Sequence, residues 1–301
     1  MIINAPAKVN LHLAVLDKRQ DGFHNLESLF VTVDFGDTLH FEPFEAKNKG
    51  KNALELTMEG PAAAGLELPA EKNIIFKALS LFRDKSRDKS LGKHGFNIGL
   101  RVRVEKYIPL GGGLGGGSSN AASTLLALNH LAGSLYGAPP FARSELLEMA
   151  AALGSDVPFF IHQVSAAWVT GRGEHIEPLD PPPWHYVLVN PGFPSDTARA
   201  FRLLDKSRET ETYTPFSGYS LTTNQYSLFK NDFLSIFPEP EKSTYNQIIS
   251  QLLDCGAEFA NLSGAGSACF GAFFKKEQAD NAALSLKKKW EFTQACSVIN
   301  F

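Results

Sequence analysis

The sequence predicts an α+β protein of two domains. Segments with the two-residue alternation of strands and segments with helical spacing occur in both halves of the chain. The chain has 301 residues, 44% of them hydrophobic, which is more than one small domain needs. Three successive prolines at 181–183 cannot lie inside a helix and indicate a stiff connection. We therefore expect a boundary between residues 160 and 183, with domains at 1–165 and 166–301.

The expected elements of the first domain follow from its periodicity. Apolar and polar residues alternate clearly at 9–15 and 98–105, which predicts two strands. Two further strands are expected between them, at 38–44 and 53–59. Helices are expected at 73–87, 119–131 and 144–153, and a short helix is expected to begin within 155–158. Ser144 is expected to cap the third of these helices, and the polar segment 46–52 is expected to be a loop.

The second domain is expected to mix the same two kinds of element. Strands are predicted at 186–190, 258–262, 268–274 and 295–299. Helices are predicted at 196–204, 243–253 and 277–290. A polar stretch near 206–226 is expected to contain little helix.

The composition excludes several classes of protein. Lys and Arg number 29 against 32 Asp and Glu, so the net charge of −3 gives no basic surface for nucleic acid or an anionic membrane. The 3 cysteines are widely spaced, which argues against a disulfide framework or a structural zinc site. No apolar run approaches the roughly 20 residues of a membrane helix, and the first residues alternate like a strand, unlike a signal peptide. We expect a cytoplasmic protein.

A glycine-rich loop connects the expected strand 98–105 to the expected helix 119–131. Glycine permits positive φ and a close approach to backbone N–H groups, and a helix N-terminus adds free donors. We therefore expect the loop to hold a polyphosphate, the alternative being a flexible surface turn. Its residues are Pro109, Leu110, Gly111, Gly112, Gly113, Leu114, Gly115, Gly116, Gly117, Ser118 and Ser119.

Two better-known phosphate-binding motifs do not fit this loop. A Walker A loop requires Gly-Lys-Ser/Thr, and no Lys lies in or just after the loop. The GxGxxG pattern occurs at Gly111, Gly113 and Gly116, but the acidic residue expected about 20 positions later is missing. A dinucleotide-binding domain is therefore not expected.

Lys8 and Asp156 are candidates for the chemistry of phosphoryl transfer. That reaction needs a hydroxyl held in line with the γ-phosphate and neutralisation of the developing charge, which a carboxylate and an ammonium can supply. The simpler interpretation of Lys8, Asn10 and His12 is a solvated strand face, since alternation places them together. The simpler interpretation of Asp156, ahead of Pro158, is a helix N-cap. Spacing alone does not bring Lys8 and Asp156 together.

Three segments together resemble the motifs of the GHMP small-molecule kinases: Ala7–Leu11, 109–120 and Asn261–Gly271. The resemblance covers almost the whole chain and implies an α+β, two-domain GHMP kinase fold, with an N-terminal ATP-binding domain and a C-terminal ferredoxin-like substrate domain. It implies that Lys8 and Asp156 are the catalytic pair, that the loop cradles the ATP phosphates, and that Asn10 contacts substrate or holds the pair. The segment Gly264-Ala265-Gly266 would then be a backbone support for the site, the alternative being a simple hairpin turn.

Two further segments, Asp21-Gly22-Phe23-His24 and 153–160, resemble one branch of this family. The branch phosphorylates the tertiary C2 hydroxyl of a cytidine-diphosphate-linked methylerythritol in the non-mevalonate isoprenoid pathway. The resemblance implies that Phe23 stacks on cytosine, that His24 hydrogen-bonds its polar edge, and that Phe201 lies across the base unless it is a core residue. Position 23 is Phe where the branch usually has Tyr, and Gly133–Phe141 looks like a surface insertion.

The same resemblance implies the cofactors, partners and competing functions. Mg²⁺ is expected with ATP, with Ser119 as a candidate ligand, whereas the 8 histidines show no metal-ligand spacing. Homoserine, mevalonate or sugar kinases are the alternatives within the family, but their substrates carry no pyrimidine. A catalytically silent nucleotide sensor is the alternative from another class, and it would not need Lys8 and Asp156. A monomer or weak homodimer is expected.

Overall fold

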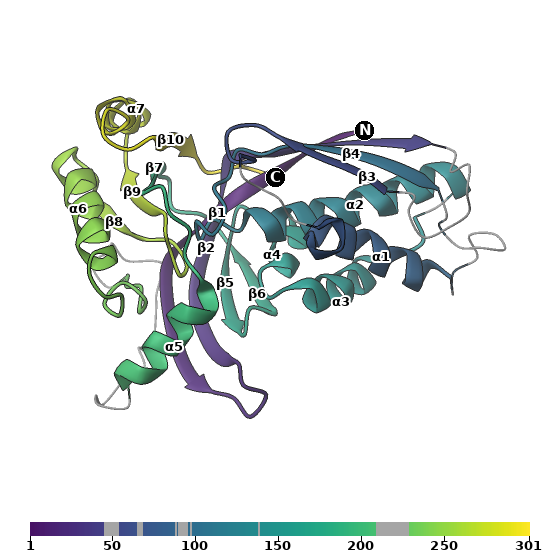
Figure 1. Cartoon of the computed structure of the whole chain (residues 1–301), viewed down its shortest axis with the longest axis horizontal. Coiled ribbons are helices and arrows are strands. Elements are labelled where there is room, and N and C mark those ends of the chain that lie inside the picture. The colour runs from purple at the N-terminus through teal and green to yellow at the C-terminus, as the bar shows by residue number, and fades with distance from the viewer. Residues whose placement is uncertain are drawn as a thin grey trace. The chain divides into compact units, whose positions relative to one another are not determined.

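The chain forms two compact units, each built from more than one stretch of sequence (Figure 1). The computed structural model describes residues 1–44, 54–64, 69–87, 89, 96, 98–137, 139–208 and 229–301. Unit 1 comprises Met1–Ala7, Gly36–Ile108 and Gly116–Gln163. Unit 2 comprises Lys8–Phe35, Pro109–Gly115 and Val164–Phe301. The long strands β1 (Ile2–Lys18) and β2 (His24–Phe44) contribute residues to both units.

Unit 1 is a sheet covered by helices. In this sheet β4 (Gly99–Glu105) pairs in parallel with β3 (Leu54–Glu59) and antiparallel with the last residues of β2. Figure 1 shows helices on one face of the sheet: α1 (Ile74–Ser86), α2 (Gly116–Tyr136) and α3 (Arg143–Leu153). The single turn η1 (Ala70–Lys72) precedes α1, and α4 (Val157–His162) packs against α2 and α3. The alternation predicted at 98–105 is confirmed, since Leu100, Val102 and Val104 are fully buried.

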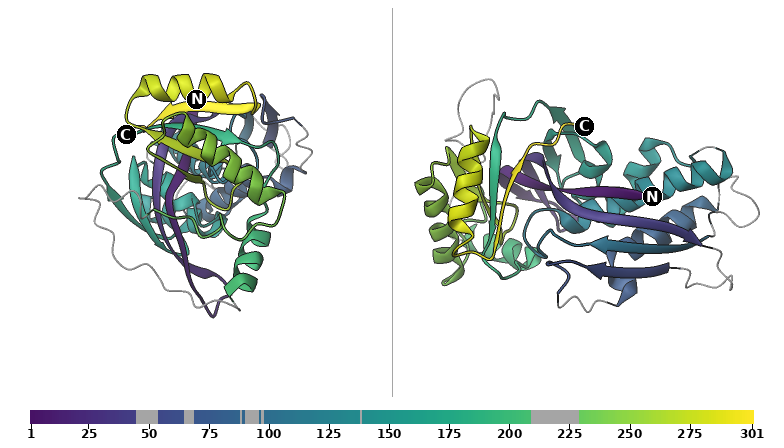
Figure 2. Two further views of the ribbon diagram at one scale, coloured as in Figure 1. Left: turned by 90° about the vertical axis from the view of Figure 1, so that its left-hand side faces the viewer. Right: turned by 90° about the horizontal axis from the view of Figure 1, so that it is seen from above.

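Unit 2 contains two groups of strands. The first residues of β2 pair with β5 (Ala166–Gly171), which forms a hairpin with β6 (His175–Leu179). A separate antiparallel sheet has the order β10 (Phe292–Ser297), β7 (His185–Asn190), β9 (Cys269–Phe273), β8 (Phe259–Leu262). Figure 2 shows α6 (Glu241–Asp254) and α7 (Lys276–Leu286) on one face of this sheet. The helix α5 (Thr197–Arg208) follows β7 in the chain.

The second sheet has the ferredoxin-like arrangement. Along the chain the order is β7, the helices α5 and α6, β8, β9, α7 and β10. The first of the four strands, β7, lies between the fourth, β10, and the third, β9. Its core joins apolar residues of the sheet and of both covering helices, among them Val187, Val189, Ile248, Leu252 and Phe273. The predicted α+β class and the ferredoxin-like C-terminal fold are therefore confirmed.

Several element boundaries differ from those expected. The strand expected at 38–44 is the end of a strand that begins at His24, and the hairpin β5–β6 was not expected at all. The helix expected from Ser119 begins at Gly116, inside the second glycine triplet. The capping role expected for Ser144 is wrong, because α3 begins at Arg143 and the Glu145 carboxylate accepts the N–H of Ala142, 2.9 Å away. The expected loop 46–52 and the part of the polar stretch beyond Arg208 lie outside the described residues.

The segment Gly133–Phe141 is not simply a surface insertion. Its first four residues complete α2, and Phe141 is buried edge-on against Phe82, with ring centroids 5.0 Å apart. Asn129 bonds both the N–H and the carbonyl of Phe141. The segment therefore returns the chain to the core of unit 1.

The division of the residues into units differs from a single cut after residue 165. The last change of unit falls at Gln163–Val164, but Lys8–Phe35 and Pro109–Gly115 also belong to unit 2. Strands as long as β1 and β2, of 17 and 21 residues, span more than one compact unit. The assignment of function to residues 1–165 and 166–301 stays a prediction.

Candidate active site

The first part of the glycine-rich loop, Pro109–Gly115, is held in unit 2 by its carbonyl groups. The carbonyl of Gly111 accepts the N–H of Ser195 at 2.9 Å and that of Ser267 at 3.0 Å. The carbonyl of Gly112 accepts the N–H of Ala268 at 3.1 Å. Gly113 and Leu114 accept in the same way, from the Ser263 hydroxyl and from the Lys8 N–H, both at 3.0 Å. This part of the loop is therefore held in place by hydrogen bonds to its backbone carbonyl groups.

Gly113 shows why this loop needs glycine. Its φ is +70°, which side-chain-bearing residues rarely adopt, and a Cβ there would lie 2.0 Å from the carbonyl oxygen of Ser263. Gly111 and Gly115 also have positive φ, at 59° and 72°. The backbones at Gly113 and Ser263 thus approach each other more closely than any residue other than glycine at position 113 would allow.

The segment that makes this approach is the third sequence motif, Asn261–Gly271. Its turn contributes the Ser263 hydroxyl and the N–H groups of Ser267 and Ala268 to the loop. The Ser195 hydroxyl in turn donates to the carbonyl of Ala265 at 2.6 Å. The motif is more than a hairpin turn, because it holds the glycine-rich loop by its backbone.

The N–H groups of the loop are left for a ligand. Within the described residues, the N–H groups of Gly113, Leu114 and Gly115 donate no hydrogen bond. The chain then enters α2 at Gly116, and the first four N–H groups of a helix have no partner within it. Donors grouped at a helix N-terminus favour an anion, and a phosphate fits them.

Lys8 is a buried cation on β1 in unit 2. Its side chain is only 3% exposed, its Nζ donates to Oδ1 of Asn10, and the ammonium lies 4.6 Å from the centroid of the Phe30 ring. The Asn10 amide nitrogen donates to the Ser28 hydroxyl at 2.9 Å. The interpretation as a solvated strand face is therefore wrong: alternation places these side chains on one face, but both faces of this part of β1 are buried.

Asp156 lies at the start of α4 in unit 1. It occupies the N-cap position, yet its side chain makes no capping hydrogen bond, because its backbone is helical (φ −86°, ψ −10°) where capping residues are extended. The N-cap interpretation is therefore wrong.

The residues expected to bind a base lie near the β1–β2 turn in unit 2. Phe23 is 49% exposed, and the Arg172 guanidinium lies 5.1 Å from its ring centroid. His24 is 8% exposed and stacks on Phe201, with ring centroids 5.1 Å apart and planes at 18°. Phe201 also meets Phe233 edge-on at 5.0 Å, so it has both a core contact and a contact with His24.

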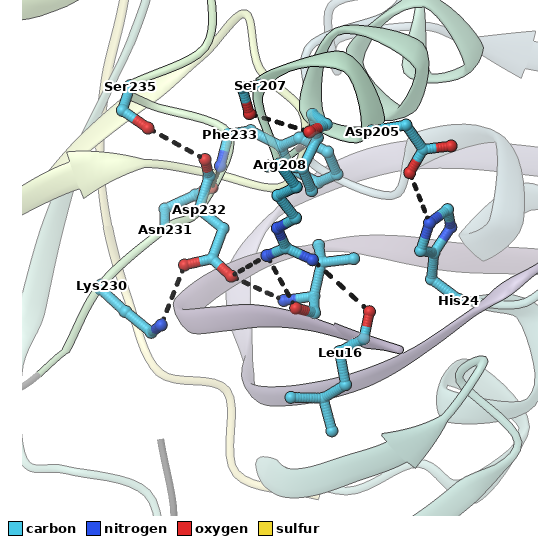
Figure 3. A network of polar contacts seen from close by, with 12 residues as sticks. Leu16, His24, Asp205, Ser207, Arg208, Lys230, Asn231, Asp232, Phe233 and Ser235 are labelled. Carbon is cyan, nitrogen blue, oxygen red and sulfur yellow. Dashed lines mark hydrogen bonds and ion pairs between the residues drawn. The ribbon is translucent and has the colours of Figure 1, made fainter. Parts of the chain in front are cut away.

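Sequence reasoning missed several polar residues in this part of unit 2. Figure 3 shows Asp205 bonded to Nε2 of His24 at 2.7 Å. Asp205 lies one helical turn after Phe201, so the spacing of four residues was a usable signal. Figure 3 also shows Asp232 joined to Lys230 and to Arg208, each at 3.0 Å. No local sequence pattern predicts this network, because it joins segments that lie far apart in the sequence.

The Asp232 network attaches the segment 229–232 to β1. The carboxylate accepts the N–H of Val15 at 2.9 Å, and two backbone hydrogen bonds join Leu13 to Lys230 and Asp232. The Lys230 N–H donates to Nδ1 of His12 at 3.2 Å. His12, stacked on Trp168, is fully buried, and burial followed by the charge of Lys230 lowers its pKa to about 4. His12 is therefore neutral at physiological pH.

No cluster of metal ligands is present among the described residues. No group of three or more His, Cys, Asp or Glu there is arranged to hold a metal ion. The Ser119 hydroxyl of unit 1 is fully buried and has no hydrogen-bond partner within the described part of the chain. An orphaned hydroxyl at a helix N-terminus is suited to a cation that arrives with a polyphosphate. In the same described residues, no helix is long and apolar enough to cross a bilayer.

The fold and this site together define a small-molecule kinase of the GHMP class. The sequence matches "GHMP kinases N terminal domain" over residues 73–163 and "GHMP kinases C terminal" over residues 231–291. The chain belongs to the 4-diphosphocytidyl-2-C-methyl-D-erythritol kinase family within that class, as its full-length relatives show.

The full-length relatives include curated proteins and solved structures. The chain is 34% identical over 296 residues to the 4-diphosphocytidyl-2-C-methyl-D-erythritol kinase of Janthinobacterium sp. (strain Marseille), covering 98% of this chain and 93% of that one. It is 35% identical to the protein of that name from Syntrophus aciditrophicus, covering 98% and 97%. A crystal structure of 4-(cytidine 5'-diphospho)-2C-methyl-D-erythritol kinase matches with a TM-score of 0.76, 30% identity and complete coverage of both chains. Homoserine kinase from Cytophaga hutchinsonii, at 17% identity and a TM-score of 0.64, shares the fold.

Proposed function

We propose that this kinase transfers the γ-phosphoryl group of ATP to the C2 hydroxyl of 4-diphosphocytidyl-2-C-methyl-D-erythritol. The observation that carries the proposal is the glycine-rich loop, whose carbonyls are bound by the protein while N–H groups remain for phosphate. The substrate is the one named in relatives that match nearly the whole chain. The homoserine and mevalonate kinases share the fold at lower identity.

Asp156 and Lys8 are proposed to act on the reacting groups. The C2 oxygen forms a bond to the γ-phosphorus, the bond from that phosphorus to the β–γ bridging oxygen breaks, and the hydroxyl proton passes to Asp156. The C2 hydroxyl is tertiary and crowded, so positioning contributes much of the rate. Lys8 would stabilise the developing charge, and its contact with Asn10 orients the ammonium.

The Ser119 hydroxyl and the phosphates of ATP are the groups proposed to hold Mg²⁺. Mg²⁺ neutralises charge on the β- and γ-phosphates when it is bound. The burial of Ser119 and its unsatisfied hydroxyl support this role. The loop N–H groups and the first turn of α2 would bind the phosphates beside it.

Phe23, His24 and Phe201 are proposed to bind the cytidine end of the substrate. The exposed ring of Phe23 offers a face for stacking, and the edge of His24 offers a hydrogen-bonding group. The proposal includes a cytoplasmic location, action as a monomer or weak homodimer, and residues 1–165 and 166–301 as the ATP-binding and substrate-binding domains.

ADP release by the purified protein with Mg²⁺ and ATP tests the function. The panel is 4-diphosphocytidyl-2-C-methyl-D-erythritol, the same polyol phosphate without cytidine, homoserine and mevalonate. Turnover of the cytidine compound alone is expected. Turnover of homoserine or mevalonate instead would discard the roles of Phe23, His24 and Phe201. ATP binding without turnover of any compound would leave a nucleotide sensor.

A further inference from the structure

Asn231 is a buried asparagine of unit 2 whose side chain bonds to three backbone groups. It is 7% exposed, and Figure 3 shows it next to Asp232. Its amide nitrogen donates to the carbonyl of Leu262 at 2.7 Å and to that of Gly264 at 2.8 Å. Its Oδ1 accepts the N–H of Phe233 at 2.9 Å. An amide nitrogen has two hydrogens, so it can serve both carbonyls at once, which a carboxylate cannot do.

The two carbonyls that Asn231 holds lie on either side of Ser263 in the third sequence motif. Ser263 is fully buried, and its hydroxyl makes two hydrogen bonds. It donates to the carbonyl of Gly113 at 3.0 Å and accepts the N–H of Asn10 at 3.3 Å. One oxygen atom therefore joins the glycine-rich loop to β1. Because Asn231 holds the backbone before and after Ser263, it determines where this oxygen lies.

The two groups that Ser263 joins belong to the parts of unit 2 proposed to act on phosphate. Asn10 receives the Lys8 ammonium on its Oδ1, and Gly113 begins the group of N–H donors left for a ligand. Gly264 fits closely against both parts. A Cβ at Gly264 would lie 3.1 Å from the carbonyl oxygen of Gly113 and 3.4 Å from Oδ1 of Asn10. A shift of this turn would therefore disturb the contacts of the loop, of Asn10, or of both.

We infer that Asn231 is a positioning residue, which acts through Ser263 to keep the Lys8 ammonium and the phosphate-binding loop aligned for phosphoryl transfer. The inference rests on the proposed function, because it assigns this alignment to that reaction. Phosphoryl transfer depends on positioning and charge stabilisation, and a misplacement of about 1 Å can cost about 10²-fold in rate. Since Asn231 acts through the turn, its loss should slow the chemical step more than it weakens substrate binding.

Asn129 supplies a matched control in unit 1. It is also an asparagine that bonds backbone groups: its amide nitrogen donates to the carbonyl of Phe141 at 3.0 Å, and its Oδ1 accepts the N–H of that residue at 3.1 Å. It lies about 20 Å along α2 from the start of the helix at Gly116. Asn231→Ala and Asn129→Ala therefore remove the same chemical group, the first from the third motif and the second from the segment that returns to the core of unit 1.

The first experiment measures kcat and KM for these variants, corrected for the folded fraction. Asn231→Ala is expected to lower kcat about 10- to 100-fold, with both KM values within about threefold of the unaltered protein. Asn129→Ala is expected to keep kcat within about twofold even where it lowers stability. Asn231→Asp, which keeps the acceptor for Phe233, is measured should Asn231→Ala not fold. An unchanged kcat in the Asn231 variant, or an equal loss in the Asn129 variant, would overturn the inference.

A double variant tests whether Asn231 acts through Ser263. Ser263→Ala is expected to lower kcat as well, because it removes the oxygen that joins Asn10 to Gly113. If the two residues act as one unit, Asn231→Ala combined with Ser263→Ala is expected to be about as slow as the slower single variant. Losses that multiply in the double variant would show that the two residues act independently, and the proposed route would be wrong.

The second experiment measures amide hydrogen exchange by NMR, which needs no substrate. The Asn10 N–H reports the contact with Ser263, and the Phe141 N–H reports the contact with Asn129 in the same way. Asn231→Ala is expected to speed exchange at Asn10 at least about tenfold and to leave Phe141 unchanged. Asn129→Ala is expected to do the reverse. Unchanged exchange at Asn10 would overturn the inference whether or not the enzyme is active. If the unaltered protein phosphorylates none of the compounds, the proposed function fails, and the exchange rates still decide whether Asn231 holds this junction.

Discussion

Asp37 and Lys106 form a buried ion pair in unit 1, with Oδ2 2.5 Å from Nζ and side chains 0% and 3% exposed. The other carboxylate oxygen accepts the N–H groups of Tyr107 at 2.7 Å and Ile108 at 2.9 Å. Lys106 also donates to the carbonyl of Ile108 at 2.8 Å. The pair therefore fixes the three residues that lead from β4 into the glycine-rich loop at Pro109.

Lys106→Met is expected to destabilise the protein by about 3–5 kcal/mol, because it leaves the Asp37 carboxylate buried without its counter-charge. The double variant Asp37→Asn with Lys106→Met removes both charges and keeps an acceptor for the two N–H groups. It is expected to be more stable than Lys106→Met alone. Urea denaturation of the two variants measures the difference, and equal stability would show that the charges are not coupled.

Gly113→Ala is expected to cost about 3 kcal/mol of stability and to abolish activity. The added Cβ would overlap the carbonyl of Ser263, and the positive φ adds strain. Gly117→Ala is the control, since a Cβ at that position would meet no atom within 4 Å beyond its chain neighbours and the backbone of α2 itself. Its stability is expected to stay within about 1 kcal/mol of the unaltered protein. Thermal unfolding compares them, and similar losses would remove the argument for close backbone approach.

The sequence predicts the strands in which apolar and polar residues alternate and misses those in which they do not. At 98–105 one face is buried and the other carries exposed arginines, so alternation is visible. In β2 the run Leu29–Val33 is buried on both sides, and no period of two remains. The sequence therefore gives no signal for a strand over Leu29–Val33.

The candidate site is predictable where the residues are contiguous and not where the fold assembles them. Eleven successive residues carry the glycine-rich loop, and both glycine chemistry and the following helix are local properties. The hydroxyl of Ser263 meets Gly113 across 150 residues, and Asp205 meets His24 across 181. Such contacts depend on the register of distant strands, which composition and spacing do not encode.

His12 is expected to make folding stability depend on pH between about 4 and 6.5. Its pKa is about 4 in the folded protein and 6.5 as a model value, so the unfolded chain binds more protons in this window. The stabilisation is complete above pH 6.5 and is lost as pH falls to 4, by up to about 3 kcal/mol. His12→Asn keeps an acceptor for the Lys230 N–H and removes the titration. Urea midpoints across this pH range should fall less in the variant, and parallel curves would contradict the assignment.

Phe23→Ala is expected to raise the KM for the cytidine substrate about 5- to 150-fold, as the loss of one stacking contact of about 1–3 kcal/mol implies. The KM for ATP is expected to stay the same. Phe274→Ala is the control, because Phe274 is equally exposed, at 50%, and also lies against another side chain, Trp184. Steady-state kinetics on both substrates tests this, and an equal effect of Phe23→Ala on both KM values would discard the stacking role.

Asp156→Asn is expected to lower kcat about 10²- to 10⁴-fold, the range for loss of a general base, with ATP binding retained. The variant removes no helix cap, because the side chain makes no capping hydrogen bond to α4. Asp196 gives the contrast, since its Oδ1 accepts the N–H groups of Ala198 and Arg199 at the start of α5. Asp196→Ala should therefore lose about 1 kcal/mol of stability. If Asp156→Asn instead turned over normally but unfolded more easily, Asp156 would be a structural residue and the proton acceptor would have to be sought elsewhere.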